Sequence, residues 1–595
     1  MLGLKVPLKD AEKWKQFITI NNLMDKRYYY KKDKNHIYFP VTSKFMIVNS
    51  SNPSIKNTEA TDNSIVSFIE MEFPKSANKG TLRENLSKML TPSELAFVKT
   101  GHDIIGSIAI LEIPKGLEKR EKLIAETLLE VNSQIKTVLK KADIHGGTFR
   151  TQKMTYLAGI NTKETTYKEN NVQLKLDVEK VYFSIRLGNE RKRISTQVKP
   201  REEILVMFSG CAPYPIVLSK NTKARHITGI EINPDGHMYG MENLRLNKVH
   251  NVLLINDDVH HAIPNIYQKI VGLKSALHNN EMELHLKKNP QIVEIHLFND
   301  SLDDDKIKQL EKNIVELKNK GLEVFFHMPF KMNGEFYNLD NDDSIDFCRK
   351  AGELCKKYFV SVIVHLCSEC ISNGEAQLIQ KVKNLEEYYD YFYFENLGDK
   401  SFSEQEDLLR ISRKAGFKNI CLDLAHLYSN YTDHKKIASV IKTIQKEFNT
   451  YFHVNDHDAK NHGLEIGKGV VDFDLLLPFV NKGVVEVESK DESKPVEHLN
   501  SYDTLKNYHN KTYDRIIMPL PKSADEFLED ALAVSKKGTV IHFYDFLEVS
   551  KFDEAAKKID KACKSRGMKY KILEVVKCGQ HAPYVFRICV DFVII

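Results

Sequence analysis

A nucleotide-binding pattern in this chain is interrupted by a long insert. The pattern begins at Glu203-Ile-Leu-Val-Met-Phe-Ser-Gly-Cys-Ala-Pro-Tyr-Pro215, ends after Asn256-Asp-Asp258, and resumes at Tyr513-Asp-Arg-Ile-Ile-Met-Pro-Leu-Pro521. A sheet tolerates such an insert where the two ends of the insert lie close together. We therefore expect one domain made from two distant stretches of sequence, with a second domain between them.

Three apolar runs in the first stretch end in residues suited to binding an adenosine. Val206-Met-Phe-Ser-Gly210 is a strand that leads into a glycine turn and then a helix, as in the first unit of a doubly wound sheet. The run Ile227-Thr-Gly-Ile-Glu231 ends in an acid that can accept both ribose hydroxyls, and Val252-Leu-Leu-Ile-Asn-Asp-Asp258 ends in acids that can receive an adenine amino group. This order predicts a class I (Rossmann-like) sheet that binds S-adenosylmethionine for methyl transfer.

The length and charge of the chain limit the number of domains, the location and the kind of partner that it can have. A chain of 595 residues exceeds the size of about 250–300 residues at which a single core stops growing, so three or more domains are expected. No apolar run of about 18 residues and no signal-peptide core are present, which predicts a cytoplasmic protein without a membrane span. The net charge of +5 is small, so a nucleic acid must be held by local basic patches. One cluster that could hold a polyanion contains Arg186, Arg191, Lys192, Arg193, Lys199 and Arg201.

Short β runs alternate with helical segments throughout the insert. The runs are Met282–Leu286, Ile292–Leu297, Val324–His327, Ser361–His365, Tyr391–Glu395, Ile420–Asp423, Tyr451–Val454 and Val484–Val487. This rhythm predicts a (β/α)8 barrel, in which the chemistry lies at the carboxyl ends of the strands.

The ends of the expected barrel strands carry metal-ligand side chains. They are His327, His365, Glu395, Asp423 with His426, His453, and Glu486. A single histidine at a strand end usually has a structural role, but a mixed set of imidazoles and carboxylates at successive ends indicates a divalent metal. Zn²⁺ suits this set best, with Mn²⁺ or Fe²⁺ as alternatives.

Motifs outside the insert resemble the archaeal and eukaryotic tRNA (guanine37-N1)-methyltransferase family. They include Gly147-Thr-Phe-Arg150, Val181-Tyr-Phe-Ser-Ile-Arg-Leu-Gly-Asn-Glu-Arg191, Met207-Phe-Ser-Gly-Cys-Ala-Pro-Tyr-Pro215, Glu231-Ile-Asn-Pro234, Asp514-Arg-Ile-Ile-Met-Pro-Leu-Pro521 and Ile541-His-Phe-Tyr-Asp-Phe546. The resemblance implies methylation of guanine N1 at position 37 of the tRNA anticodon loop. The variants at Met207 and Met518 look most like the archaeal branch that also methylates C7 of the 4-demethylwyosine precursor.

The resemblance also implies roles for individual residues. Guanine N1 carries a proton, so a base must remove it while negative charge at O6 is stabilised. By motif position Glu190 is the base, Arg150 the cation at O6, and Tyr182 a support for the flipped guanine. The alternatives are a helix-start ion pair for Glu190 and a phosphate contact for Arg150. The implied cofactor residues are Arg186, Phe208, Gly210, Glu231, Asp257, Asp258 and Pro521.

The sequence differs from the family motifs at two positions, both in segments expected to contact the cofactor or the target guanine. Val206 stands where many methyltransferases have an acid, and Pro519 replaces the asparagine of an Asn-Leu-Pro motif. Both put details of cofactor and base binding in doubt, and neither removes the acid at Glu231.

The insert resembles the endonuclease IV and xylose-isomerase-like barrel superfamily. The resemblance rests on Phe326-His-Met-Pro329, Val364-His-Leu366, Phe394-Glu-Asn396, Leu422-Asp-Leu-Ala-His426, Phe452-His-Val-Asn-Asp456, His462-Gly-Leu-Glu-Ile-Gly-Lys-Gly469 and Val485-Glu-Val-Glu488. By position it adds His462 to the seven strand-end ligands. His462 is offset by one residue from the usual spacing, and Lys460 stands where endonuclease IV has an acid, with Asp456 or Asp458 as alternative ligands. A two-metal site is therefore favoured over a three-metal site.

We therefore expect a multidomain α/β protein and a monomer. The expected domains are an N-terminal tRNA-binding domain at 1–46, an α+β RNA-binding domain at 62–180, methyltransferase parts at 181–265 and 510–595, and the barrel at 270–500. The main hypothesis is a tRNA methyltransferase with an additional metal-binding barrel, whose own substrate would be a nucleic acid or a sugar. In the alternative, the barrel is an abasic-site phosphodiesterase or a sugar isomerase, and the methyltransferase part is a nucleic-acid-binding scaffold. The barrel could also be a metal-stabilised module that shapes tRNA binding.

Overall fold

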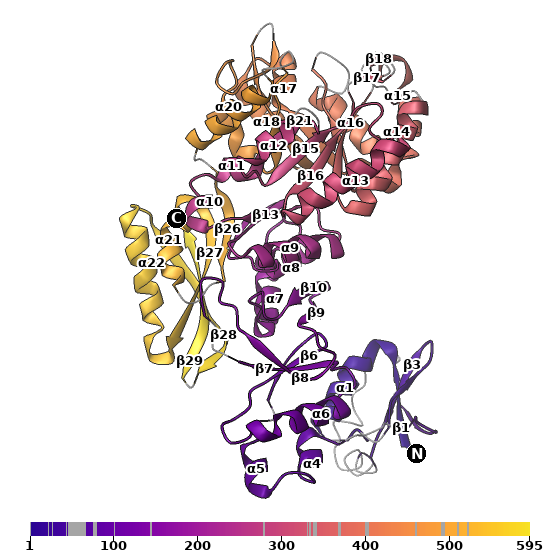
Figure 1. Ribbon diagram of the computed structural model, residues 1–595, viewed down its shortest axis with the longest axis vertical. Coiled ribbons are helices and arrows are strands. Elements are labelled where there is room, and N and C mark those ends of the chain that lie inside the picture. The colour runs from indigo at the N-terminus through magenta and orange to yellow at the C-terminus, as the bar shows by residue number, and fades with distance from the viewer. Residues whose placement is uncertain are drawn as a thin grey trace. The chain divides into compact units, whose positions relative to one another are not determined.

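The computed structural model describes most of the chain, in two compact units (Figure 1). The described residues are 2–21, 23–25, 28–42, 45, 67–74, 80–99, 101–142, 146–277, 280–329, 331–332, 335–336, 339, 342–366, 371–398, 404–458, 461–488, 494–508, 511–519, 523–582 and 584–595. Pro521 and the side chain of His462 lie outside them. Among the helices described, none is both long and apolar enough to cross a bilayer.

The smaller unit comprises Met1–His102, Leu111–Leu139 and Tyr156–Ile160. It contains an antiparallel sheet of order β2-β3-β1-β4, and helix α1 packs its apolar face on this sheet through Ile18. Two short helices begin with reciprocal capping boxes, Thr81 with Glu84 and Thr91 with Glu94, which satisfy their first backbone N–H groups. The elements are β1 (Leu2–Pro7), α1 (Ala11–Ile20), β2 (Lys31–Lys32), β3 (His36–Pro40), β4 (Ser67–Glu70), α4 (Leu82–Leu86), α5 (Pro92–Phe97) and α6 (Glu121–Val131).

In the larger unit, the interrupted nucleotide-binding pattern closes into one seven-stranded sheet of order β13-β12-β11-β26-β27-β29-β28. The two halves meet where β11 pairs with β26 in parallel, at Ile204↔Arg515 and Val206↔Ile517. Figure 1 shows the yellow C-terminal strands beside the magenta ones. The strands are β11 (Glu203–Met207), β12 (His226–Glu231), β13 (Val252–Asn256), β26 (Tyr513–Met518), β27 (Ser535–Glu548), β28 (Tyr570–Ala582) and β29 (Val585–Ile594).

Burial explains why the central strands of this sheet are continuous apolar runs. Every residue of β11 is buried, because helices cover both faces of a mainly parallel sheet. Only β29 runs antiparallel to its neighbours, β27 and β28. The helices associated with this region include α7 (Gly188–Gln197), α8 (Pro213–Asn221), α9 (Pro234–Leu246), α10 (Val259–Ala262), α11 (Ile266–Ile270), α21 (Leu528–Ala533) and α22 (Asp553–Ser565).

The insert is a closed barrel of eight parallel strands, as its sequence rhythm predicts. It closes where β14 pairs with β25, at Gly272↔Val484. The strands are β14 (Val271–Ser275), β15 (Ile292–His296), β16 (Glu323–His327), β19 (Ser361–His365), β20 (Phe392–Glu395), β21 (Asn419–Asp423), β22 (Asn449–Val454) and β25 (Gly483–Val485). The helices of the barrel include α12 (Glu281–Leu286), α13 (Asp304–Asn319), α14 (Asp342–Tyr358), α15 (Ile371–Lys383), α16 (Gln405–Ala415), α17 (Leu424–Asn430), α18 (His434–Ile444) and α20 (Lys494–Thr504).

The prediction of a strand at Met282–Leu286 is wrong. This run lies in helix α12: Met282 and Leu286, one helical turn apart, pack against the core, whereas Leu284 is exposed and His285 is fully buried. The first barrel strand is Val271–Ser275, which follows helix α11 without a turn. We missed it because no Gly, Pro or Asn signal separates it from the preceding helix.

The barrel and the seven-stranded sheet share one apolar core. A single cluster of buried side chains runs from Leu205 and Ile255 in the sheet, through Tyr267 in α11, to the barrel strands. Lys511 is completely buried beside this core, and its Nζ donates to Glu203 Oε2 (2.7 Å), the Val480 carbonyl (2.9 Å) and Asn481 Oδ1 (2.8 Å). The insert is therefore packed onto the sheet that it interrupts.

Candidate functional site

A cavity lies at the carboxyl ends of β11 and β12, the position where doubly wound sheets bind their ligands. Its walls come from both sides of the sheet and from the segments before it. The lining residues include Phe149, Arg150, Tyr182, Phe183, Phe208, Gly210, Tyr214, Glu231, Asn233, Asp258, Pro519 and Phe527.

The loop between β11 and α8 shapes one wall of the cavity. Phe208, Gly210 and Ala212 all have left-handed backbone angles, with φ of 60°, 57° and 64°. Only glycine adopts this region without strain, so the tight turn stores strain at a ligand-facing loop. The turn directs the Gly210 N–H to Glu231 Oε2 at 2.6 Å, and the Asn233 N–H donates to Oε1 at 2.8 Å. Glu231 is therefore held rigidly at the end of β12.

The predicted cofactor residues divide into two groups. Phe208, Gly210, Glu231 and Asp258 line the cavity. Asp257 does not; it accepts hydrogen bonds from His261 Nδ1 (2.7 Å) and Lys269 Nζ (2.8 Å). Arg186 is exposed and pairs with Asp103 at 3.2 Å, also away from the lining. Pro521 lies outside the described residues.

Arg150 and Tyr182 both line the cavity, and each has a conformational constraint. Arg150 has a left-handed backbone with φ of 52°. The hydroxyl of Tyr182 accepts a hydrogen bond from Arg587 Nη2 at 2.7 Å. The cavity therefore presents a guanidinium group and a fixed aromatic ring beside the turn that precedes α8.

Glu190 is not among the lining residues but lies behind the wall, buried on helix α7. Arg193 donates to both of its carboxylate oxygens at 2.7 Å, and the Tyr544 hydroxyl donates to Oε1 at 2.7 Å. The Tyr544 hydroxyl also lies 3.0 Å from that of Tyr214, which lines the cavity. Two tyrosine hydroxyls thus connect Glu190 to the cavity.

The surroundings of Glu190 keep it ionised. Burial raises the pKa of Glu190, but the hydrogen bonds and the charge of Arg193 outweigh burial and hold the pKa below its usual value. Arg193 is itself oriented by Asp591, whose carboxylate lies 2.7 Å away, and Asp591 bonds His542 at 2.7 Å. Sequence reasoning missed Arg193, Tyr544 and Asp591 as parts of this network. Tyr544 lies in a family motif and could have been noticed, whereas no local signal marks Asp591.

The basic cluster before β11 is engaged within the protein. Arg191 is fully buried and donates to Glu169 Oε2 at 2.8 Å, and Arg201 donates to the Gln445 carbonyl. Arg186 and Arg193 pair with acids as described above. Arg191 is therefore unavailable to a polyanion, and the interpretation of the rest of the cluster as a polyanion site stays a prediction.

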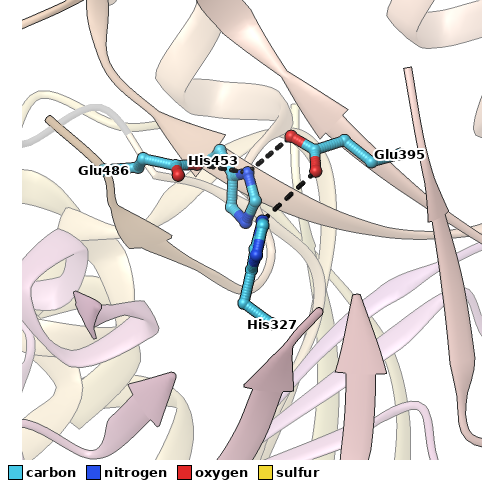
Figure 2. A group of neighbouring side chains, drawn as sticks. All are labelled: His327, Glu395, His453 and Glu486. Atoms are coloured by element: carbon cyan, nitrogen blue, oxygen red, sulfur yellow. Dashed lines mark hydrogen bonds and ion pairs between the residues drawn. The ribbon is translucent and has the colours of Figure 1, made fainter. Parts of the chain in front are cut away.

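The centre of the barrel contains a second, fully buried cluster (Figure 2). His327, Glu395, His453 and Glu486 place their ligand atoms within 4.8 Å of one another. His453 Nδ1 lies 2.8 Å from Glu395 Oε1 and 2.5 Å from Glu486 Oε2. The remaining oxygen of Glu395 faces His365 Nε2 at 2.8 Å and His327 Nε2 at 3.4 Å. The strand ends thus bring together five of the predicted ligands, Glu395 and four around it.

A neighbouring group shares Glu395 and adds Asp423 and His426, again with ligand atoms within 4.8 Å. Asp423 caps helix α17 by accepting the His426 N–H at 2.8 Å, and its other oxygen accepts from Asn455 at 2.7 Å. His426 Nδ1 lies 2.9 Å from the Asn396 carbonyl. Hydrogen bonds therefore orient both side chains before any ligand binds.

Two residues of the barrel centre were missed, Lys274 on β14 and Glu294 on β15. Lys274 Nζ forms an ion pair with Glu486 and lies 3.6 Å from Glu294 Oε1, and Glu294 lies 3.2 Å from His453 Nε2. Burial by itself lowers the pKa of Lys274. The negative charges of Glu486, Glu294 and Glu395 outweigh burial and raise the pKa above its usual value, so the ammonium group stays charged. A glutamate within the apolar run Ile292–His296 could have signalled Glu294. Lys274 was hidden because its strand was not recognised.

The barrel cluster suits a divalent cation. Four buried carboxylates, those of Glu294, Glu395, Asp423 and Glu486, face one buried ammonium group and several imidazoles. Buried carboxylates need compensating charge, and mixed nitrogen and oxygen donors are the ligands that Zn²⁺ and related metals prefer. The residues present therefore fit a metal of this type.

The sheet with its adenosine-type acid and glycine turn defines a class I methyltransferase, here combined with a TIM barrel. Comparison with known families supports both parts. Residues 165–320 and 495–573 match the TRM5/TYW2 methyltransferase domain, 82–162 the TYW2 N-terminal domain, 3–47 the tRNA methyltransferase 5 N-terminal domain, and 280–507 a xylose isomerase-like TIM barrel.

Curated relatives support the same assignment. The chain is 36% identical over 259 residues to tRNA (guanine(37)-N(1))-methyltransferase Trm5b of Pyrococcus abyssi, covering 43% of this chain and 72% of that protein. It is 31% identical over 312 residues to tRNA (guanine(37)-N(1))/4-demethylwyosine(37)-methyltransferase Taw22 of Nanoarchaeum equitans, covering 51% of this chain and 96% of that protein. It is 33% identical over 202 residues to tRNA 4-demethylwyosine(37)-methyltransferase Taw21 of Saccharolobus solfataricus, covering 33% of this chain and 76% of that protein. The chain belongs to the TRM5/TYW2 methyltransferase family, which confirms the predicted resemblance.

Proposed function

We propose that this protein transfers a methyl group from S-adenosylmethionine to N1 of guanine 37 in the tRNA anticodon loop. C7 of the 4-demethylwyosine precursor at the same position is a second target, since relatives named for each reaction match the chain. The observation that carries the proposal is the cavity in which Glu231 and the Gly210 turn lie together with Arg150 and Tyr182. A cytoplasmic location and a monomeric state remain predictions.

Each side of the cavity has a distinct role in this proposal. Glu231 accepts the ribose hydroxyls of the methyl donor, and Asp258 receives its adenine amino group. Arg150 stabilises the negative charge that develops on guanine O6, and Tyr182 supports the flipped base. Because Arg587 fixes the Tyr182 hydroxyl, the ring is held in place before the base arrives.

Glu190 accepts the guanine proton through the two tyrosines. The N1 proton passes to the Tyr214 oxygen as the Tyr214 proton passes to Tyr544, whose own proton moves to the Glu190 carboxylate. S-adenosylmethionine, which Glu231 and Asp258 would hold, would supply the methyl group to the deprotonated N1 and would leave as a neutral thioether. The relay is supported by the 3.0 Å and 2.7 Å distances along it and by the ionised state of Glu190.

Removing one hydroxyl tests the relay. We expect Tyr544→Phe to lower kcat for tRNA methylation by about 10- to 100-fold, because proton transfer to a positioned base is lost while the cavity keeps its shape. Single-turnover kinetics with labelled S-adenosylmethionine measure the effect. Tyr570→Phe, whose hydroxyl makes only a 3.5 Å contact with Asp560, is the matched control. Equal rates for the two variants would show that the proton leaves by another route.

Mass spectrometry of tRNA nucleosides tests the reaction itself. An unmodified transcript with guanine at position 37 is expected to gain one methyl group, recovered as 1-methylguanosine. The same transcript with adenine at position 37 is expected to gain none. A tRNA carrying 4-demethylwyosine decides whether C7 is also methylated. Absence of methylation in every substrate would contradict the proposal.

We also propose that the barrel centre binds a divalent metal, with zinc first and manganese or iron as alternatives. His327, His365, Glu395, His453 and Glu486 would hold it, with Asp423 and His426 beside them. His462 is a further candidate from sequence. When bound, such a metal supplies an electrophilic centre suited to a phosphodiester or to a hydroxy-carbonyl sugar. Cleavage of abasic-site DNA with and without chelator separates the endonuclease IV-like alternative from the isomerase and from a purely structural role.

A further inference from the structure

A third cluster of ligand-type side chains lies between two helices of the barrel. Helix α12 and helix α20 pack on each other, and both pack on β14, the strand at which the barrel closes against β25. Glu281 and His285 are one helical turn apart on α12, so both side chains project from the same face. His498 approaches from α20. One ligand atom from each of the three residues lies within 4.8 Å of the other two.

The two histidines are buried in a way that hydrogen bonds do not explain. Both are completely inaccessible to solvent. Both nitrogens of His498 lack a hydrogen-bond partner among the described residues, and so does Nδ1 of His285. His285 Nε2 reaches only the Pro495 carbonyl, at 3.4 Å. Leaving the nitrogens of a buried imidazole without hydrogen-bond partners destabilises the fold, so a partner for these nitrogens is expected at this position.

The geometry favours a cation as that partner. Glu281 Oε1 lies 4.0 Å from His498 Nδ1, and the two imidazole rings have centroids 5.7 Å apart at an interplanar angle of 70°. The two rings are therefore not stacked face to face, and one ligand atom from each ring lies within 4.8 Å of the other and of the carboxylate. Two imidazoles with one carboxylate form a ligand set that Zn²⁺ uses, whereas Mg²⁺ and Ca²⁺ prefer oxygen ligands alone.

We propose that Glu281, His285 and His498 form a zinc-type cation site that joins the first and last helices of the barrel. This seam site is separate from the cluster at the barrel centre, with which it shares no residue. Its role is structural: the bound ion connects α12 to α20 across the closing pair β14–β25.

Metal content measured on the full-length protein tests the seam site. The chain is stripped with chelator, reloaded with Zn²⁺, freed of excess ion, and analysed for zinc per chain by mass spectrometry. We expect Glu281→Gln to hold one zinc ion fewer than wild type, or to bind that ion about 100-fold more weakly. Glu283→Gln, an exposed residue on the same helix, is the matched control and is expected to keep the full zinc content.

A second variant and a second probe keep the test decisive. His498→Gln is expected to lose the same ion, and Co²⁺ loading is expected to lose the corresponding visible absorption band in both variants. If His498→Gln does not fold, Glu281→Gln decides, because Glu281 is partly exposed. Equal zinc content and equal affinity in Glu281→Gln and Glu283→Gln would overturn the proposal. The zinc count does not depend on methyl transfer, so its failure is distinguishable from failure of the proposed function.

Discussion

Glu190→Gln is expected to lower kcat for tRNA methylation by about 10²- to 10⁴-fold, with little change in the affinity for S-adenosylmethionine. The substitution keeps the size of the side chain but removes the negative charge that accepts the guanine proton. Affinity for the donor is expected to persist because Glu190 does not line the cavity and Glu231 is untouched. Single-turnover rates and equilibrium binding of the donor measure the two effects separately.

Glu574→Gln is the matched control for this variant. Glu574 also faces Arg193, at 3.6 Å, but is exposed and lies on the edge strand β28. It is expected to change kcat by less than about 2-fold, as for most exposed ion pairs. If Glu190→Gln bound S-adenosylmethionine more weakly but, once bound, methylated tRNA at the wild-type single-turnover rate, the role of Glu190 would be structural.

The pH dependence follows from the same environment. The pKa of Glu190 is held below its usual value, so the carboxylate is ionised above that pKa and its contribution is lost only as pH falls through it. Between pH of about 8 and about 5, protonation of Glu190 should therefore not lower the single-turnover rate of the complex with tRNA and S-adenosylmethionine. An acidic limb near neutral pH that disappears in Glu190→Gln would contradict this assignment.

Lys274→Met is expected to destabilise the metal-free barrel by about 3–5 kcal/mol, because it leaves two buried carboxylates without their ammonium partner. Glu294 is completely buried and Glu486 nearly so, and Lys274 pairs with both. Urea unfolding followed by far-ultraviolet circular dichroism, in the presence of chelator, measures the loss. A divalent ion is expected to reduce the deficit, since it supplies the missing positive charge.

Lys306→Met is the control for the barrel prediction. Lys306 pairs with Asp300, but both side chains are more than half exposed, so the cost should stay below about 1 kcal/mol. Unfolding of Lys274→Met at the same urea concentration as Lys306→Met would show that Lys274 is not the required counter-ion of Glu294 and Glu486.

Local sequence patterns were enough to predict the architecture of this protein and most of its candidate ligands. A strand, a glycine turn and a terminal acid at Glu231 are local signals, and they identified a sheet completed by Tyr513–Met518 far along the chain. The barrel was likewise predictable, because parallel strands alternate with helices and the carboxyl ends of these strands meet at one face. His327, Glu395, His453 and Glu486 converge there for that reason.

The partners of these residues, in contrast, became known only from the folded chain. The strand at Val271–Ser275, and with it Lys274, depends on pairing with β15 and β25 and carries no local turn signal. Glu190 lies behind Tyr544 and Tyr214 instead of in the cavity, and Arg193 bonds Asp591 from the far end of the chain. The seam residues Glu281 and His498 are likewise joined only by the packing of α12 on α20. Side-chain neighbours of this kind are set by long-range strand register and helix packing, which local sequence patterns do not encode.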